Sequence, residues 1–347
     1  MSLRTRLSVI TFLFIAVIVY FSRHELIHAY QLLETVNIWI LLLLIPGQLL
    51  VYYTAGEMIF SYLRGKKSIS HIAPHELTRM SLEMNFVNHV LPSGGVSGVS
   101  YMGWRLGKYG VTPGRATMAQ VVRFAMAFVA FICLLSLAVL AVTIDGSVNR
   151  WIILVSSTLV SLMLGALLGG VYLMSSNKRM AAFGNWLTKF INRTVKAVTF
   201  GRKKKIITHE TIDRFFEEMH HDFVALKNDK KLLLRPFLWG LANVVSEVLL
   251  FLITFWALGV TVNPAPILIA YGVATLAGFF VVTPGGAGAY EAIMVGFLAI
   301  AGLSQGTAIA GIVLTRVILL IGTIALGYLF YQHAIIKYGK TTSTPTR

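Results

Sequence analysis

FFVVTPGGAGAYEAIM (Phe279–Met294) breaks a long apolar segment with a proline and three glycines, Pro284, Gly285, Gly286 and Gly288, and then places Glu291 directly after them. Proline and glycine both interrupt helices. An interrupted helix in lipid leaves backbone groups without hydrogen-bond partners, which is tolerated only where protein or water surrounds them. The stretch therefore predicts a broken helix that borders a polar interior within a larger helical membrane protein.

The composition of the whole chain supports a membrane protein. Of its 347 residues, 56% are hydrophobic and only 13% are charged, whereas about a quarter of a soluble domain is charged. Segments apolar enough to cross a hydrocarbon core of ~30 Å occur at 7–21, 37–60, 115–142, 151–174, 236–258 and 307–331. We expect an all-α polytopic integral membrane protein, with about six full crossings and two broken hairpins that re-enter the bilayer.

The second broken hairpin is expected between Pro74 and Gly110, and it resembles the one between Pro266 and Gly302. Pro92-Ser93-Gly94-Gly95 matches Pro284-Gly285-Gly286-Ala287, and each tetrad is followed eighteen residues later by a glycine. A helix start then follows, with Thr112 or Ser304 as the expected N-cap and Pro113 suited to the first helical position. Each of these helices carries one arginine, Arg123 or Arg316. These matches predict an internal duplication, with repeat one at 37–142 and repeat two at 236–331.

The charge pattern predicts the topology. Residues 176–235 form a loop whose Asn177–Arg235 part holds fourteen Lys/Arg against six Asp/Glu, and cytoplasmic loops of membrane proteins carry such an excess. With this loop inside, hairpin one enters from the cytoplasm, hairpin two enters from outside, and both termini are cytoplasmic. Inverted repeats with broken helices are typical of transporters. We expect one transmembrane domain at 1–340 in a bacterial or archaeal inner membrane, followed by a disordered tail at 341–347.

The loop contains an amphipathic segment at 208–227, whose apolar face is formed by Ile212, Phe215, Phe216, Met219 and Phe223. Such a helix either lies on the inner leaflet or packs against the protein's own helices. The basic residues of the loop predict contact with anionic inner-leaflet lipids, and this explanation is commoner in membrane proteins than nucleic-acid binding.

Arg123 and Arg316 are the main candidate site residues. Eleven or twelve residues of helix put them ~16–18 Å from their helix starts, near the middle of the membrane. A charge at that depth needs a partner, and the candidate acids within the membrane are Glu57, Glu83, Glu247 and Glu291. Two interpretations remain open: the arginines bind a lipid phosphate, or they form closed Arg–Glu pairs that only join helices.

The glycines of the two breaks complete the predicted substrate-binding set. Exposed backbone amides at the start of a half-helix bind anions, and the glycines expected to supply or permit them are Gly94, Gly95, Gly285, Gly286 and Gly288. On the first hairpin, Asn85, Asn88 and His89 either line a cavity or cap the broken backbone. The sequence contains no nucleophile–base set, nucleotide-binding motif or metal motif, so we predict no cofactor, no metal and no enzymatic activity.

These residues carry a family resemblance. TPGGAGAYE (Thr283–Glu291), the later Gly302-Leu303-Ser304 and Arg316 resemble the C-terminal signature of the lysylphosphatidylglycerol synthase transmembrane-region family, also described as the flippase-like domain. LPSGG with Arg123 resembles its N-terminal counterpart, although Ser93, Gly94 and Gly95 depart from the usual Pro-Gly-Arg-x-Gly-Glu form. The resemblance covers about residues 7–333. It implies movement of aminoacylated phosphatidylglycerol between leaflets, with Glu291 and Arg316 on the substrate pathway, and it does not extend to the soluble aminoacyl-transferase domain.

The sequence thus predicts a flippase or transporter of an anionic or aminoacylated phospholipid, or of a similar amphiphile. The alternatives are a non-transporting membrane partner that recruits a cytosolic lipid-modifying enzyme or glycosyltransferase, and an integral enzyme acting on a lipid head group. A homo-oligomer is compatible with each of these functions.

Overall fold

The protein is described here from a computed structural model that covers residues 20, 27, 30, 31, 34, 36–91, 96–144, 150–198, 209–278 and 288–339. Every regular element in this part of the chain is a helix. In chain order these are α3 (Ile38–Leu41), α4 (Leu44–Gly65), α5 (Pro74–Val90), α6 (Val96–Gly107), α7 (Pro113–Ile144), α8 (Arg150–Met174), α9 (Asn177–Val198), α10 (His209–Asn228), η1 (Lys230–Leu233), α11 (Leu234–Ala257), α12 (Pro264–Gly278), α13 (Ala289–Ile300) and α14 (Gln305–Tyr338).

Helices long and apolar enough to cross a membrane occur where the sequence predicts crossings. In the described part these spans are Ile38–Gly65, Pro113–Leu140, Ile153–Met174, Lys230–Ala257 and Gln305–Tyr338. The crossing expected at 7–21 lies outside the described residues, with the single exception of Tyr20. The protein is therefore an all-α polytopic membrane protein.

Each predicted hairpin consists of two helices on either side of a break. α5 packs against α6, and α12 packs against α13. The breaks themselves, 92–95 and 279–287, lie outside the described residues, and so do Gly94, Gly95, Gly285 and Gly286. The helix starts that follow are as predicted: α7 begins at Pro113, and the Ser304 hydroxyl caps α14 by accepting from Thr307 N at 3.2 Å.

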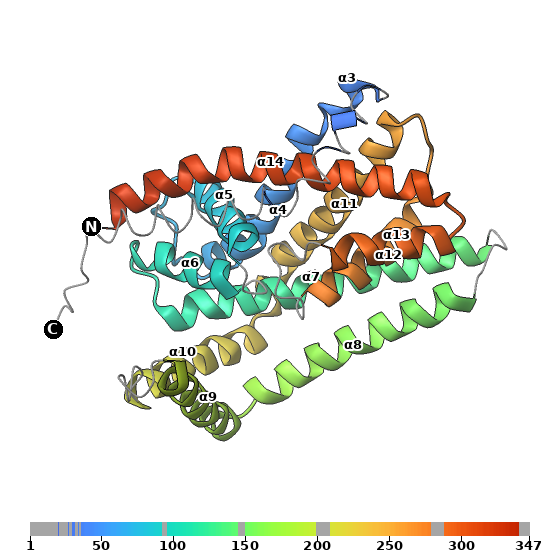
Figure 1. Cartoon of the computed structure of the whole chain (residues 1–347). Helices are drawn as coiled ribbons and strands as arrows, with labels where there is room; N and C mark the ends of the chain where they lie inside the picture. Colours follow the sequence, from blue (N-terminus) through green and yellow to red (C-terminus); the bar gives the residue numbers. More distant parts are fainter. Residues whose placement is uncertain are drawn as a thin grey trace.

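The two hairpins lie at opposite ends of the helix bundle (Figure 1). α5 and α6 share one end with α9 and α10, whereas α12 and α13 lie between α7 and α14 toward the other end. α7 and α14 run in opposite directions, and α4 is antiparallel to α11, since Asn37 N donates to Ala257 O at 2.8 Å. This arrangement is the one expected for an inverted repeat. The repeat boundaries at 37–142 and 236–331 remain a prediction.

The amphipathic segment of the loop forms α10, and its apolar face is covered by protein. Phe216 and Met219 are buried, with Phe215 and Phe223 packed beside them, in a cluster that includes side chains of α4, α5 and α7. Of the two interpretations of this face, packing against the protein's own helices is therefore the one found. The side chain of Ile212 lies outside the described part.

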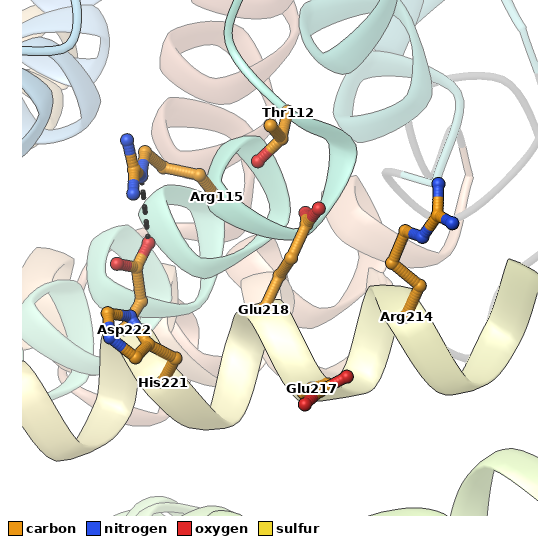
Figure 2. A pocket seen from close by; sticks show the side chains of 7 residues that line it. All are labelled: Thr112, Arg115, Arg214, Glu217, Glu218, His221 and Asp222. Carbon is orange, nitrogen blue, oxygen red and sulfur yellow. Dashed lines mark hydrogen bonds and ion pairs between the residues drawn. The ribbon is translucent and has the colours of Figure 1, made fainter. Parts of the chain in front are cut away.

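Acidic side chains of α10 also hold the start of α7 (Figure 2). Glu218 Oε2 accepts from Gly114 N at 3.2 Å, and Asp222 forms ion pairs with Arg115 and Lys66, both at 3.3 Å. Carboxylates are favourable at a helix N-terminus because the amides and the helix dipole there are positive. α10 is thus anchored to the membrane helices at the basic end of the bundle.

Close helix packing on α14 depends on Gly311. A Cβ added there would lie 2.2 Å from the Phe255 ring, whereas one added at Gly306 meets nothing within 4 Å. We expect Gly311→Ala to lower the free energy of unfolding by about 1–3 kcal/mol through overpacking. Thermal unfolding in detergent checks this, with Gly306→Ala as the matched control on the same helix. Equal unfolding midpoints for the two variants would contradict the close contact.

Candidate functional site

Glu291 joins the start of α13 to the middle of α14. Its Oε1 accepts from Arg316 Nε at 2.8 Å, and its Oε2 accepts from Gly288 N at 2.7 Å. Gly288 precedes α13 with φ +87°, a backbone conformation that side chains with a Cβ resist. One carboxylate thus caps α13 and bonds the half-buried Arg316.

Arg316 is only partly enclosed by these contacts. Its side chain is 22% exposed, and that of Glu291 is 19% exposed. The guanidinium carbon lies 4.3 Å from the centroid of the Tyr290 ring, a cation–π distance. Of the four candidate acids, Glu291 is therefore the one that bonds Arg316, and the pair keeps some access to the surroundings.

Glu247 and Tyr271 lie near the two arginines. Glu247, on α11, lies close enough to Arg316 to interact with its charge, and Tyr271, on α12, is close enough to interact with both Glu247 and Arg123. No hydrogen bond of Glu247 is found within the described residues. One polar cluster thus receives side chains from α7, α11, α12 and α14.

Arg123 differs from Arg316 in its partners. Its Nη1 lies 3.3 Å from Gln120 Oε1 and 3.6 Å from Met84 Sδ, and its guanidinium stacks at 5.0 Å over the Phe124 ring. No carboxylate of the described residues lies within ion-pair distance. A guanidinium in this position has attraction left for an anion, because neutral partners compensate a buried charge poorly.

Glu83 lies elsewhere, and the structure brings it to neither Arg123 nor Arg316. Its Oε2 accepts from Arg105 Nε at 2.7 Å and from the Tyr101 hydroxyl at 3.0 Å. Both members of the Glu83–Arg105 pair are almost fully buried, with exposures of 2% and 1%. This is the closed pair that joins helices, formed with an arginine that was not among the candidate site residues.

A signal for the Glu83–Arg105 pair exists in the sequence. Glu83 lies nine residues before Pro92, and Arg105 lies ten residues after Gly95. Folding a helical hairpin at the break brings these two positions opposite each other. The pairing could therefore have been inferred once the hairpin itself was predicted.

Glu57 is also paired away from the site. Both of its carboxylate oxygens bond the guanidinium of Arg64, two turns nearer the end of α4. Of the four acids considered as partners for the two arginines, only Glu291 forms a direct ion pair with one of them, and Glu247 interacts at longer range.

The polar residues of the first hairpin support its backbone. Asn88 Oδ1 accepts from Gly98 N at 2.9 Å, so the amide capping predicted for this group holds for Asn88. A Cβ on Gly98 would lie 2.2 Å from that same oxygen, so only glycine fits there without a shift. Asn85 and His89 bond backbone carbonyls of their own helix.

Comparison with known proteins gives two kinds of match. The sequence pattern of the lysylphosphatidylglycerol synthase TM region matches residues 7–327. A UPF0104 membrane protein of Methanothermobacter thermautotrophicus is 24% identical over 253 residues, which cover 72% of this chain and 70% of that protein. A second UPF0104 membrane protein of the same organism is 27% identical over 132 residues, covering 38% of this chain and 36% of the other.

Proposed function

Because the chain belongs to the lysylphosphatidylglycerol synthase transmembrane-region family, we propose that it moves an anionic or aminoacylated phospholipid, or a similar amphiphile, between the leaflets of the cytoplasmic membrane. The observation that carries the proposal is the partly exposed Arg316–Glu291 pair, near which Glu247 and, beside Arg123, Tyr271 also lie. Their helices, α7 and α14, run in opposite directions, so each arginine approaches the cluster from a different end of the bundle.

In this proposal Arg123 binds the phosphate of the lipid, because it has no carboxylate partner among the described residues. Arg316 completes the charge neutralisation while Glu291 holds it against the start of α13. Glu247 is proposed to offer its carboxyl group to the amino group of an aminoacylated head group. Gly94, Gly95, Gly285, Gly286 and Gly288 are proposed to let the lipid approach the backbone at the breaks.

Movement between leaflets would follow from rocking one repeat against the other around this cluster. The sequence holds no nucleotide-binding motif, so we propose an ion gradient, the membrane potential or lipid asymmetry as the driving force. The basic end of the bundle, with α9 and α10, faces the cytoplasm in this arrangement, as the positive-inside bias predicts.

We further propose that α9 lies against anionic lipid of the inner leaflet. α9 holds five basic and no acidic residues, and it follows the spanning helix α8 directly. Phe183, Trp186 and Phe190 form an exposed stripe on it, with Lys189 exposed nearby. Aromatic and basic side chains on one helix are typical of the membrane interface.

Reconstitution into vesicles with fluorescent anionic phospholipid tests the transport function. We expect transfer between leaflets to be faster than in protein-free vesicles, and Arg123→Met to slow it about 10-fold, since charge-assisted hydrogen bonds contribute ~1.5–3 kcal/mol. Arg214 is an exposed residue of α10. Arg214→Met is therefore the control and should leave the transfer rate unchanged.

Two outcomes would overturn the proposal. Transfer no faster than in protein-free vesicles, from protein shown to be folded, would favour a membrane partner that recruits a lipid-modifying enzyme. Chemical turnover of the head group by the purified protein would favour an integral enzyme.

A further inference from the structure

A cavity with polar, aromatic and aliphatic lining residues, none of them from the Arg123–Arg316 cluster, lies between the second half of α4 and the start of α11. Its volume is about 460 Å³. Its polar and aromatic lining comes from one face of each helix, namely Tyr53, Glu57, Ser61 and Arg64 on α4 and Arg235 and Trp239 on α11. These α4 positions are three or four residues apart, so they form one continuous stripe along the helix.

The cavity carries an excess of positive charge. Arg64 is neutralised by Glu57, to which both of its terminal nitrogens bond. Arg235 is exposed and has no hydrogen bond or ion pair to any residue that the structure describes. The lining therefore holds one net positive charge, which matches the single negative charge of a phosphodiester.

A buried hydroxyl in the same lining has no partner. Ser61 is 3% exposed, and its Oγ forms no hydrogen bond within the described part of the chain. A buried polar group without a partner costs about 1–3 kcal/mol, so such groups are normally satisfied. A ligand oxygen in the cavity would satisfy Ser61 and could accept from Arg235 as well.

The cavity has an apolar side that continues toward the membrane. Tyr53 and Trp239 pack edge to face with their ring centroids 5.5 Å apart. Along the same two helices Leu49, Leu50 and Val245 are exposed, and in a membrane-spanning bundle an exposed apolar surface faces lipid chains. A ligand with a charged head and apolar tails therefore fits this place.

The position of the cavity along the helices agrees with that ligand. Arg64 is the penultimate residue of α4, and Arg235 is the second residue of α11. Lys66 and Lys67 follow α4, and Lys230 and Lys231 precede α11. The cavity thus lies at the basic end of two spanning helices, at the depth where lipid phosphates are found.

We propose that this cavity binds the phosphodiester of one membrane phospholipid. Arg235 and Ser61 donate to the phosphate oxygens, Arg64 adds positive charge, and the acyl chains lie along the exposed faces of α4 and α11. This site is separate from the Arg123–Arg316 cluster, and its existence does not depend on the transport function.

Native mass spectrometry of the detergent-purified protein tests the site. The probes are dioleoyl phosphatidylglycerol, dioleoylglycerol with the same chains but no phosphate, and inorganic phosphate. We expect phosphatidylglycerol to bind more tightly than either other probe. Arg235→Gln should weaken the tightest lipid-binding event about 10-fold. Lys230→Gln, an exposed basic residue outside the lining, is the matched control.

Ser61→Leu provides an independent variant, because it fills the cavity without changing any charge. It should also remove the tightest binding event, and thermal unfolding establishes that the variant is folded. Unchanged affinity in both variants would overturn the proposal. Binding of inorganic phosphate as tight as that of phosphatidylglycerol would show an anion site and not a lipid site, and binding of dioleoylglycerol as tight would show a purely apolar groove. Vesicle transfer assays report on the proposed function separately.

Discussion

Lipid transfer is expected to fall about 100-fold when Arg316 is replaced by methionine, and to stay low when Glu291 is replaced by glutamine in the same chain. The single variant removes the second positive charge that is proposed to neutralise the phosphate, and it also leaves the Glu291 carboxylate without its charged partner. The double variant removes both charges, so folding recovers while the guanidinium stays absent. Loss of charge-assisted hydrogen bonds worth ~1.5–3 kcal/mol accounts for the expected size. Vesicle transfer rates and unfolding midpoints are measured on the same preparations.

The double variant separates the two interpretations of this pair. Glutamine can still accept from Gly288 N through its side-chain oxygen, so the cap of α13 is preserved. If the pair serves only to join α13 to α14, transfer by the double variant should return to the wild-type rate. That recovery would rule out a direct role of Arg316 in binding the lipid.

Replacing Arg105 by methionine is expected to be the most destabilising single change among those considered. Glu83 would then be a buried carboxylate that keeps only its bond to the Tyr101 hydroxyl. Breaking a buried ion pair from one side costs about 3–5 kcal/mol, because the remaining charge stays buried without compensation. Arg105 also packs over the Tyr338 ring at 4.4 Å and lies 3.6 Å from Glu76, so its loss loosens contacts with α14 and α5.

The double variant Arg105→Met with Glu83→Gln provides the control for this prediction. A buried ion pair replaced by neutral groups of similar size is often close to neutral for stability. We therefore expect the double variant to recover most of the lost unfolding midpoint and to transfer lipid at nearly the wild-type rate. A double variant that folds normally but no longer transfers lipid would assign Glu83 to the substrate pathway, as the sequence first suggested.

The two Arg–Glu pairs thus look alike in sequence and differ in their surroundings. Glu83 and Arg105 are sealed between the two arms of one hairpin, with exposures of 2% and 1%. Glu291 and Arg316 are about a fifth exposed and border the cluster that contains Glu247. Removing the arginine of the first pair should lower stability more than transfer, and removing the arginine of the second should lower transfer more than stability.

The sequence by itself determined the helical membrane class, the positions of the described long helices and the two broken hairpins. It also placed Glu291 among the candidate partners of Arg316 and predicted the cap at Ser304. The reason is that lipid tolerates few exceptions: a spanning segment must be apolar and helical, so each proline, glycine or charge within one is informative on its own. Each of these inferences depends only on residues that are close together in the sequence, or on the match between the two repeats.

Only the tertiary structure decided which helices become neighbours. It paired Glu83 with Arg105, covered the apolar face of α10 with protein, and brought Arg123 and Arg316 to one cluster through Tyr271. It also placed Ser61 opposite Arg235 in a cavity between α4 and α11. Periodicity shows which face of a helix is polar or apolar, but the partner of that face depends on how all the helices pack, since several arrangements bury similar apolar area.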